Sequence, residues 1–314
     1  MWKEKKSMKV YNDIAHIDKI TEQGTALVLG KFDGLHKGHR LLIDMVVSQK
    51  KNGLIPAVFT FARAPREHIE KQRQQYILTT AEKRLFMEES GVEILVEHPL
   101  NDVFLGMEPE DFIKNILVSA LHVRKIYCGP DMGFGRGRRG NVAMLRQYEE
   151  KYGYETIVVD KLRYMEREIS STYIREEIKK GSIGLYNELL GYPYTVIGTV
   201  EPGKQLGREL GFPTVNIVPE PDKILPPNGV YFTKAIIDGD TYNGVTNIGV
   251  RPSVDNEDKL TIETHILGIS MDMYGKTLEL QFMEFEREEK KFCSTEELKQ
   301  AILQDIELCK KYFA

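Results

Sequence analysis

The sequence is poor in the residues that build disulfide frameworks and membrane spans. Only three of its 314 residues are cysteine, and their odd number and wide spacing exclude a disulfide scaffold and the paired close spacing of a zinc site. No stretch approaches the ~18 continuous apolar residues of a membrane span. The N-terminal MWKEKKSMKV lacks the apolar core and cleavage site of a signal peptide. We therefore expect a cytoplasmic protein with free thiols and no membrane partner.

Charge of one sign is not in excess either. The chain has 43 basic and 47 acidic residues, interspersed along its length. Such a balance predicts no surface dedicated to nucleic acid or acidic lipid, so any basic site is expected to be local. At 314 residues the chain exceeds the usual size of one domain, and two domains are expected.

The first half alternates short apolar runs with longer helix-like segments. Residues 79–90, TTAEKRLFMEES, set Leu85 and Phe86 among charges and end at Gly91, as a surface helix does. This rhythm is typical of an α/β domain in which helices cover a parallel, doubly wound sheet. We place this domain at residues 1–187, with strands predicted at 25–29, 55–61, 93–96, 125–128 and 156–159.

The second half, residues 188–314, changes to short β-like runs separated by glycine, proline and aspartate. Six such runs predict a small antiparallel β-barrel, and the Asp238-Gly239 step between two of them is a strong hairpin signal. One helix is expected to follow, because Ser294 and Glu297 have capping-box spacing. An apolar stripe on this helix predicts packing against the barrel; it consists of Leu298, Ile302, Ile306, Cys309 and Phe313.

A motif rich in glycine and histidine, GKFDGLHKGH at residues 30–39, follows the first predicted strand. Ligands of open α/β sheets collect at the carboxyl ends of the strands. His36 and His39 are three apart at the start of a helix, so they are expected to share a face beside partly positive backbone N–H groups. The glycines, Gly30, Gly34 and Gly38, allow a tight turn and close approach of a phosphate. The motif predicts a phosphate site; its alternative is a plain turn with solvated histidines.

Two further segments follow later strands. In CGPDMGFGRGRRGN, residues 128–141, Asp131 and the glycines can shape a pocket floor. The arginines of this segment, Arg136, Arg138 and Arg139, also permit nucleic-acid binding as an alternative, although no wider basic patch supports it.

The second of these segments is EISSTYIREEI, residues 168–178. Its hydroxyl residues, Ser170, Ser171 and Thr172, are typical helix caps. Arg175 lies one turn further on and would share a face with Ser171, which predicts a second anion site. Capping and phosphate binding are compatible in this segment.

The barrel half contains GRELGFPTVN, residues 207–216, and IETHIL, residues 262–267. The glycine-rich part can offer N–H groups to phosphates. Thr214 and Asn216 alternate onto one face of a strand and present two oxygens to a hard cation such as magnesium. Glu263 and His265 lie opposite Thr264, and a carboxylate in a barrel mouth beside such a site is a candidate general base for a hydroxyl.

In this order, the motifs resemble those of the bacterial bifunctional riboflavin kinase/FMN adenylyltransferase (FAD synthetase) family, from about residue 10 to 313. The resemblance implies a Rossmann-like nucleotidyltransferase domain at 1–187, which makes FAD from FMN and ATP, and a riboflavin kinase barrel at 188–314. It also implies Mg²⁺ as cofactor, and ATP, riboflavin and FMN as the small-molecule substrates, with no nucleic-acid partner. Oligomeric state stays open.

The resemblance also assigns roles to individual residues. Glu263 matches the base that activates the riboflavin hydroxyl, and Thr214 and Asn216 match the ligands of magnesium and of ATP phosphates. His36 and His39 match the HxGH histidines that face the ATP phosphates. The remaining matches concern ATP and phosphate binding: Gly30, Phe32, Asp33, Gly34, Gly38, Asp131, Ser171, Thr172 and Arg175 in the first domain, and Gly207, Arg208 and Gly211 in the second.

Two stretches depart from the family pattern. FARAP, residues 61–65, places Ala62, Arg63 and Ala64 where the family has FxPHP or FxPNP, and Met132 occupies an aromatic position. Ala64 has no side-chain group for a phosphate or flavin, so adenylyl transfer can be weakened. Two alternatives are therefore kept: a riboflavin kinase only, with a weakened or inactive adenylyltransferase domain, and a flavin- or nucleotide-sensing binding protein.

Overall fold

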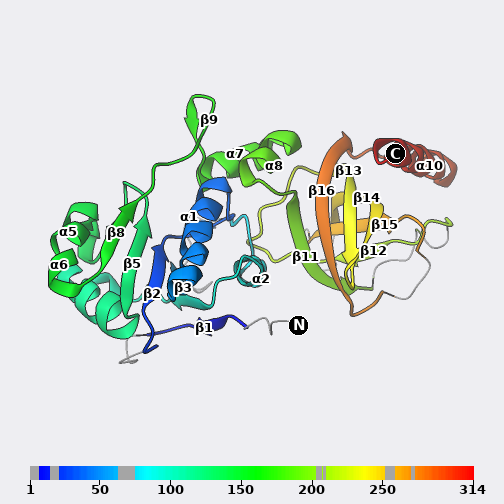
Figure 1. Cartoon of the computed structure of the whole chain (residues 1–314). Helices are drawn as coiled ribbons and strands as arrows, with labels where there is room; N and C mark the ends of the chain where they lie inside the picture. Colours follow the sequence, from blue (N-terminus) through cyan, green and yellow to red (C-terminus); the bar gives the residue numbers. More distant parts are fainter. Residues whose placement is uncertain are drawn as a thin grey trace. The chain divides into compact units, whose positions relative to one another are not determined.

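The structure is a computed structural model, which describes residues 7–14, 21–62, 75–202, 207, 210–251, 259–269 and 273–314 (Figure 1). It divides into two compact units, Met1–Gln74 with Leu78–Ser171, and Gln75–Ile77 with Thr172–Ala314. The helix α8 (Ile183–Leu190) and nearly all of α7 (Ser171–Lys180) group with the second unit. The domain boundary expected between residues 187 and 188 stays a prediction.

The first unit is built on a six-stranded, fully parallel sheet, as predicted. Its order is β1 (Lys9–Tyr11), β4 (Ile94–His98), β3 (Ile55–Phe61), β2 (Thr25–Leu29), β5 (Val123–Cys128) and β8 (Glu155–Val158). The five predicted strands are present with ends shifted by no more than about two residues, which is the usual uncertainty. The edge strand β1 was not predicted, because three residues carry too little pattern.

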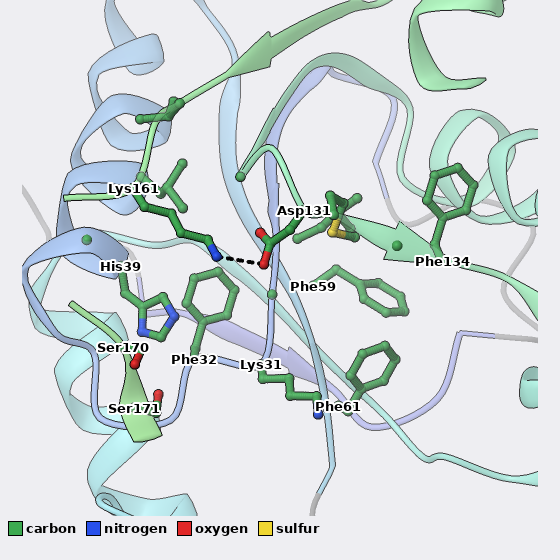
Figure 2. Close-up of a pocket in the computed structure, with 18 of the residues that line it drawn as sticks. Lys31, Phe32, His39, Phe59, Phe61, Asp131, Phe134, Lys161, Ser170 and Ser171 are labelled. Atoms are coloured by element: carbon green, nitrogen blue, oxygen red, sulfur yellow. Dashed lines mark ion pairs between the residues drawn. The ribbon is translucent and has the colours of Figure 1, made fainter. Parts of the chain in front are cut away.

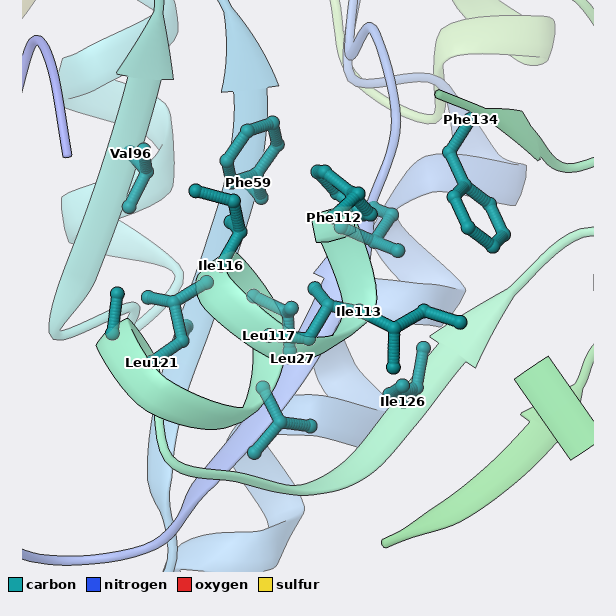
Figure 3. Packing of buried hydrophobic residues seen from close by; sticks show 14 of the residues in the cluster. Leu27, Phe59, Val96, Phe112, Ile113, Ile116, Leu117, Leu121, Ile126 and Phe134 are labelled. Carbon is teal, nitrogen blue, oxygen red and sulfur yellow. The ribbon is translucent and has the colours of Figure 1, made fainter. Parts of the chain in front are cut away.

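Alternation along the central strand shows that both faces of this sheet are buried. Ala26 and Val28 of β2 pack with Val46 of α1 (Lys37–Ser48) in one core. Leu27 belongs to the core on the other face, together with the helix η3 (Phe112–Ala120). Figure 3 shows Leu27, Phe59 and Val96 of the sheet facing Ile116 and Leu117 of η3. The doubly wound arrangement is therefore confirmed.

The strand order places a topological switch point at the carboxyl end of β2. The chain runs from β2 outward through β3 to β4, and then returns to add β5 on the other side of β2. Ligand crevices of open α/β sheets form where the order reverses in this way. The segments after β2 and β5, residues 30–39 and 128–141, both leave the sheet at this edge.

Shorter elements complete the first unit. The predicted helix 79–90 is α2 (Thr80–Glu89), in which Thr79 and Glu82 form a reciprocal capping box. The other elements are η1 (Gln49–Asn52), α3 (Asp102–Leu105), α4 (Pro109–Asp111), β6 (Gly133–Phe134), η4 (Arg136–Arg138), β7 (Gly140–Asn141), α5 (Val142–Gln147), α6 (Glu149–Tyr152), β9 (Arg163–Tyr164) and β10 (Arg167–Glu168).

The second unit contains the predicted closed antiparallel barrel of six strands. The strands are β11 (Tyr194–Glu201), β12 (Val215–Ile217), β13 (Gly229–Ile237), β14 (Asp240–Arg251), β15 (Lys259–Ile266) and β16 (Thr277–Arg287), in the order β11-β12-β15-β14-β13-β16. The predicted hairpin joins β13 to β14, and Asp238 and Gly239 take φ values of 51° and 94°. Two left-handed residues in a two-residue loop are the signature of a type I′ turn.

The C-terminal helix α10 (Thr295–Tyr312) begins where the capping signal predicted, since the Ser294 side chain accepts a hydrogen bond from the Glu297 N–H. Only part of the apolar stripe of α10 packs against the barrel. Ile306 and Cys309 are buried, and α10 contacts β14. Leu298 and Ile302, one to two turns earlier, line a cavity of the barrel unit instead. None of the helices in the described part of the chain has the length and apolar character that a membrane crossing requires.

Candidate active sites

The turn after β2 explains two of the predicted glycines. A Cβ on Gly30 would lie 3.0 Å from the ring of Phe32, which is fully buried and takes a φ of 49°. Gly34 is left-handed, with a φ of 88°. Gly38 differs from expectation, because the space a Cβ would fill is occupied by the His36 ring, 3.3 Å away, and not by open room for a phosphate. The turn is therefore packed around its own side chains.

His36 and His39 share a face, as predicted. His36 is the N-cap of α1, and its ring stacks on that of His39 with centroids 3.7 Å apart and planes at 21°. The Phe32 ring lies 5.0 Å from the His39 ring, with the two planes tilted by 59°; Figure 2 shows His39 and Phe32 adjacent at the pocket. The Nδ1 atoms of both histidines are buried without a hydrogen-bond partner among the described residues.

Burial keeps both imidazoles neutral. Desolvation lowers the pKa of His36 to about 4, and His39 has its pKa lowered well below 6.5 by burial and then by the nearby His36. Neutral imidazole retains one N–H donor per ring. At neutral pH the pair therefore offers hydrogen bonds, supplemented by the partly positive N-terminus of α1, to an anion.

This burial predicts a pH-dependent stability. Because the pKa of His36 is lower in the folded state than its ordinary 6.5, its contribution is complete above pH 6.5 and is lost as the pH falls toward 4. His36→Asn should reduce the fall in unfolding free energy between about pH 7 and pH 4.5 by about 2.5 kcal/mol. Urea unfolding at the two pH values measures this. A fall in His36→Asn as large as that of the wild type would show that His36 does not carry this pH dependence.

The expected pocket floor is present after β5. The carboxylate of Asp131 pairs with Lys161 at 2.8 Å, and the backbone carbonyl of Asp131 accepts a hydrogen bond from Arg138 at 3.1 Å (Figure 2). Lys161 lowers the pKa of Asp131 through this contact. Lys161 also reaches Glu168 at 3.2 Å. Sequence reasoning missed Lys161, because a lone lysine eight residues beyond Gly153 carries no motif.

The hydroxyl segment is tied to the motif after β2. Ser171, the last residue of the first unit, donates a hydrogen bond to the backbone carbonyl of Asp33 over 2.5 Å. Thr172 and Arg175 group with the second unit, where Arg175 contacts the Thr172 hydroxyl at 3.4 Å. The role of these two residues at a phosphate stays a prediction.

These elements surround a cavity of about 540 Å³ in the first unit. Its polar lining includes the two histidines, Lys31, Asp131 and Lys161. Its lining also includes phenylalanines, namely Phe59, Phe61, Phe104, Phe112 and Phe134, of which Figure 2 shows Phe59, Phe61 and Phe134. A cavity that combines charged and aromatic side chains suits a ligand that joins a flat ring system to a phosphate.

One departure from the family pattern, Met132, lies at this cavity. Met132 lines the cavity and packs against the same buried cluster as Phe134, so a flexible apolar side chain fills the aromatic position. The Ala62 N–H donates to the His98 carbonyl, which continues the pairing of β3 with β4. Arg63 and Ala64 lie outside the described residues.

A second cavity, of about 290 Å³, lies in the barrel unit. Glu263 and His265 line it, while Thr264 between them is fully buried and hydrogen-bonded to Thr246. The alternation along β15 is therefore confirmed. The carboxylate, however, does not point into a barrel mouth. Thr264 points into the barrel interior. Glu263 faces a cavity outside the barrel, and Leu298 and Ile302 of α10 also line this cavity.

The predicted cation ligands lie beside Glu263. Asn216 is directly opposite Glu263 in the β12–β15 register and is 6% exposed. Thr214, which precedes β12, lines the cavity. Within the described residues no group of three His, Cys, Asp or Glu side chains could hold a metal ion. A cation here would need substrate oxygens in its shell, as Mg²⁺ commonly does with phosphates.

The glycine-rich segment before β12 shapes the same cavity. The carbonyl of Gly207 accepts a hydrogen bond from Phe212 at 2.7 Å, and a Cβ on Gly207 would lie 2.4 Å from the Phe212 carbonyl. Gly211 is left-handed, with a φ of 89°. Both positions therefore require glycine. Arg208 lies outside the described residues.

Known families match both units. The family model described as FAD synthetase matches residues 18–173, and the one described as riboflavin kinase matches residues 190–313. A solved structure described as a macrolide-efflux protein from Streptococcus pneumoniae has the same architecture, with a TM-score of 0.85 and 27% identity over 96% of this chain and 98% of that one.

Curated relatives match over nearly the whole length. A bifunctional riboflavin kinase/FMN adenylyltransferase from Listeria monocytogenes is 35% identical over 95% of each chain. One from Buchnera aphidicola is 33% identical over 98% of this chain and 99% of its own. Full-length similarity of this degree, together with the two family models and the two cavities, shows that the chain belongs to the bifunctional riboflavin kinase/FMN adenylyltransferase family.

Proposed function

We propose that the two cavities divide the two reactions of the family between them. The cavity of the barrel unit phosphorylates riboflavin with ATP, and the cavity of the parallel-sheet unit transfers AMP from ATP to FMN, which yields FAD and pyrophosphate. One observation carries this proposal: the glycine–histidine turn and the Glu263 strand lie in separate cavities, each within the residues matched by the corresponding family model.

For the kinase step, we assign the base to Glu263. Its carboxylate accepts the proton of the terminal ribityl hydroxyl, whose oxygen forms a bond to the γ-phosphorus of ATP as the bond to the β-phosphate oxygen breaks. Thr214 lines the cavity, and Asn216 is the register partner of Glu263 on the neighbouring strand. These two residues would hold a divalent cation, proposed to be Mg²⁺. The bound cation would neutralise charge on the phosphates.

For the adenylyl step, a phosphate oxygen of FMN attacks the α-phosphorus of ATP, and the bond to the pyrophosphate oxygen breaks. His36 and His39 donate hydrogen bonds to the phosphates, and the first N–H groups of α1 add positive potential. The histidines are neutral without the nucleotide. Negative phosphates placed against them favour the protonated form, so binding can raise the pKa of the pair.

The free thiols support a location for these reactions. Cys128, Cys293 and Cys309 form no disulfide in the structure, and Cys128 and Cys309 are buried. Unpaired thiols suit a reducing compartment. We therefore place the enzyme in the cytoplasm.

Product identification tests the function. Purified protein with riboflavin, ATP and Mg²⁺ should first form FMN and then FAD. Chromatography of the flavins over time measures the two products. EDTA should stop both steps. FMN that accumulates without FAD would favour the kinase-only alternative raised by Ala64 and Met132, and the absence of both products would favour a binding protein.

A further inference from the structure

The barrel cavity contains a second carboxylate that the kinase mechanism does not use. Glu289 follows the end of β16 and lines the same cavity as Glu263. Its Oε1 accepts a hydrogen bond from the Asn247 amide at 3.1 Å. Glu289 is an exposed residue, and this contact holds its carboxylate at the cavity.

Gly249 makes room for this carboxylate. A Cβ on Gly249 would lie 2.3 Å from Glu289 Oε1, closer than real Cβ contacts permit, and 3.0 Å from Asn247 Nδ2, which is a tight contact. Gly249 is two residues beyond Asn247 on β14, so both lie on the same face of the strand. The fold therefore leaves a defined position for the carboxylate, because any larger residue at 249 would displace it.

Asn247 stands between the two carboxylates. It is directly opposite Glu263 in the β14–β15 register, and its amide donates a hydrogen bond to Glu289. Side chains opposite one another on adjacent strands are separated by about 5 Å at Cβ. The cavity therefore presents the proposed base and the second carboxylate on one surface, separated by a single amide side chain.

The chemistry of this surface favours a ligand with several hydroxyl groups. An ionised carboxylate is acceptor-only and has about four lone-pair sites. Asn247 satisfies one of those sites on Glu289, which leaves capacity for further donors. Phosphate oxygens and the Glu289 carboxylate carry like charge and both accept hydrogen bonds, so they do not pair, although the cationic Arg287 and Lys290 line the same cavity. A metal ion has no three-residue cluster here among the described side chains. Neighbouring hydroxyls on the chain that carries the reacting alcohol meet these requirements.

We propose that Glu289 is a specificity-determining residue of the kinase reaction, which accepts hydrogen bonds from the non-reacting hydroxyls of the ribityl chain. This inference rests on the proposed kinase function of the same cavity. It assigns Glu289 a role in recognising a polyol chain, separate from the proton transfer assigned to Glu263.

A substrate pair tests the inference. Riboflavin is compared with a flavin whose N10 chain has the same length but only the terminal hydroxyl. In Glu289→Gln, kcat/KM for riboflavin should fall by about 10- to 100-fold, the value of a hydrogen bond to a charged group, whereas the value for the analogue should change by less than about twofold. Glu288→Gln, the neighbouring glutamate whose side chain is exposed, serves as the matched control and should resemble wild type with both substrates.

A second variant tests the position of the carboxylate. Gly249→Ala keeps Glu289 in the chain but fills the space that its carboxylate occupies. This variant should lose the same preference for riboflavin over the analogue. If kcat/KM of Glu289→Gln falls equally with both substrates, or falls with neither, the inference is overturned. The kinase function still stands in that case, provided that the wild-type protein phosphorylates riboflavin. A wild-type protein that phosphorylates neither flavin would instead overturn the proposed function itself.

Discussion

Replacement of Glu263 by glutamine is expected to lower kcat for riboflavin phosphorylation by ~10²–10⁴-fold, the usual contribution of a general base. The amide has nearly the same shape but cannot accept the proton of the hydroxyl. Glu263 is half-buried and lies opposite Asn216, so glutamine can occupy its place without a cavity. FAD formation from added FMN should be unchanged, because that reaction is assigned to the other unit.

The control is Glu284→Gln, a change to an exposed glutamate on β16 that does not line the cavity. It should leave both activities near the wild-type values. Initial rates at saturating riboflavin, with FMN measured by chromatography, give kcat directly. If the Glu263→Gln protein phosphorylates riboflavin at the wild-type rate, Glu263 is not the base. If its rate falls while its thermal unfolding midpoint equals that of the wild type, the loss of rate is not caused by a loss of fold.

Most of the fold could be predicted because its signals are local. The alternation that put Leu27 and Val28 on opposite faces of a buried strand follows from the two-residue period alone. Likewise, Asp238-Gly239 and the Ser294 cap depend only on neighbours in sequence. The position of Leu298 and Ile302 at a cavity was not predictable, since an apolar stripe does not reveal which of its residues pack and which line a site.

The site was predictable where chemistry is concentrated in a short motif, as at His36 and His39. It was not predictable where the fold assembles single residues from segments that are distant in sequence. Lys161 meets Asp131, and Asn247 meets Glu289, across 30 and 42 positions of sequence respectively. The stacking of the two imidazoles and their lowered pKa values also needed the structure, because burial of a helix start depends on packing.

Replacement of His39 by asparagine is expected to reduce FAD formation from FMN by ~10²–10³-fold, which corresponds to about 2.7–4 kcal/mol for one lost preorganised donor. Asparagine keeps an N–H donor but is shorter than imidazole, and it no longer stacks at 3.7 Å on His36. The change therefore removes the donor from its position and also loosens its neighbour. Riboflavin phosphorylation should be unaffected, because His39 lines only the cavity of the parallel-sheet unit among the described pockets.

His122→Asn supplies the matched control, since His122 lies before β5 and contacts Arg124 outside the cavity. Both variants are given FMN, ATP and Mg²⁺, and pyrophosphate release is followed together with FAD. Only His39→Asn should lose the coupled formation of both products. Equal losses in phosphorylation and adenylylation would show that the division of the two reactions between the cavities is wrong. A selective loss locates adenylyl transfer at the imidazole pair, because the kinase cavity of the same molecule then serves as an internal measure of folding.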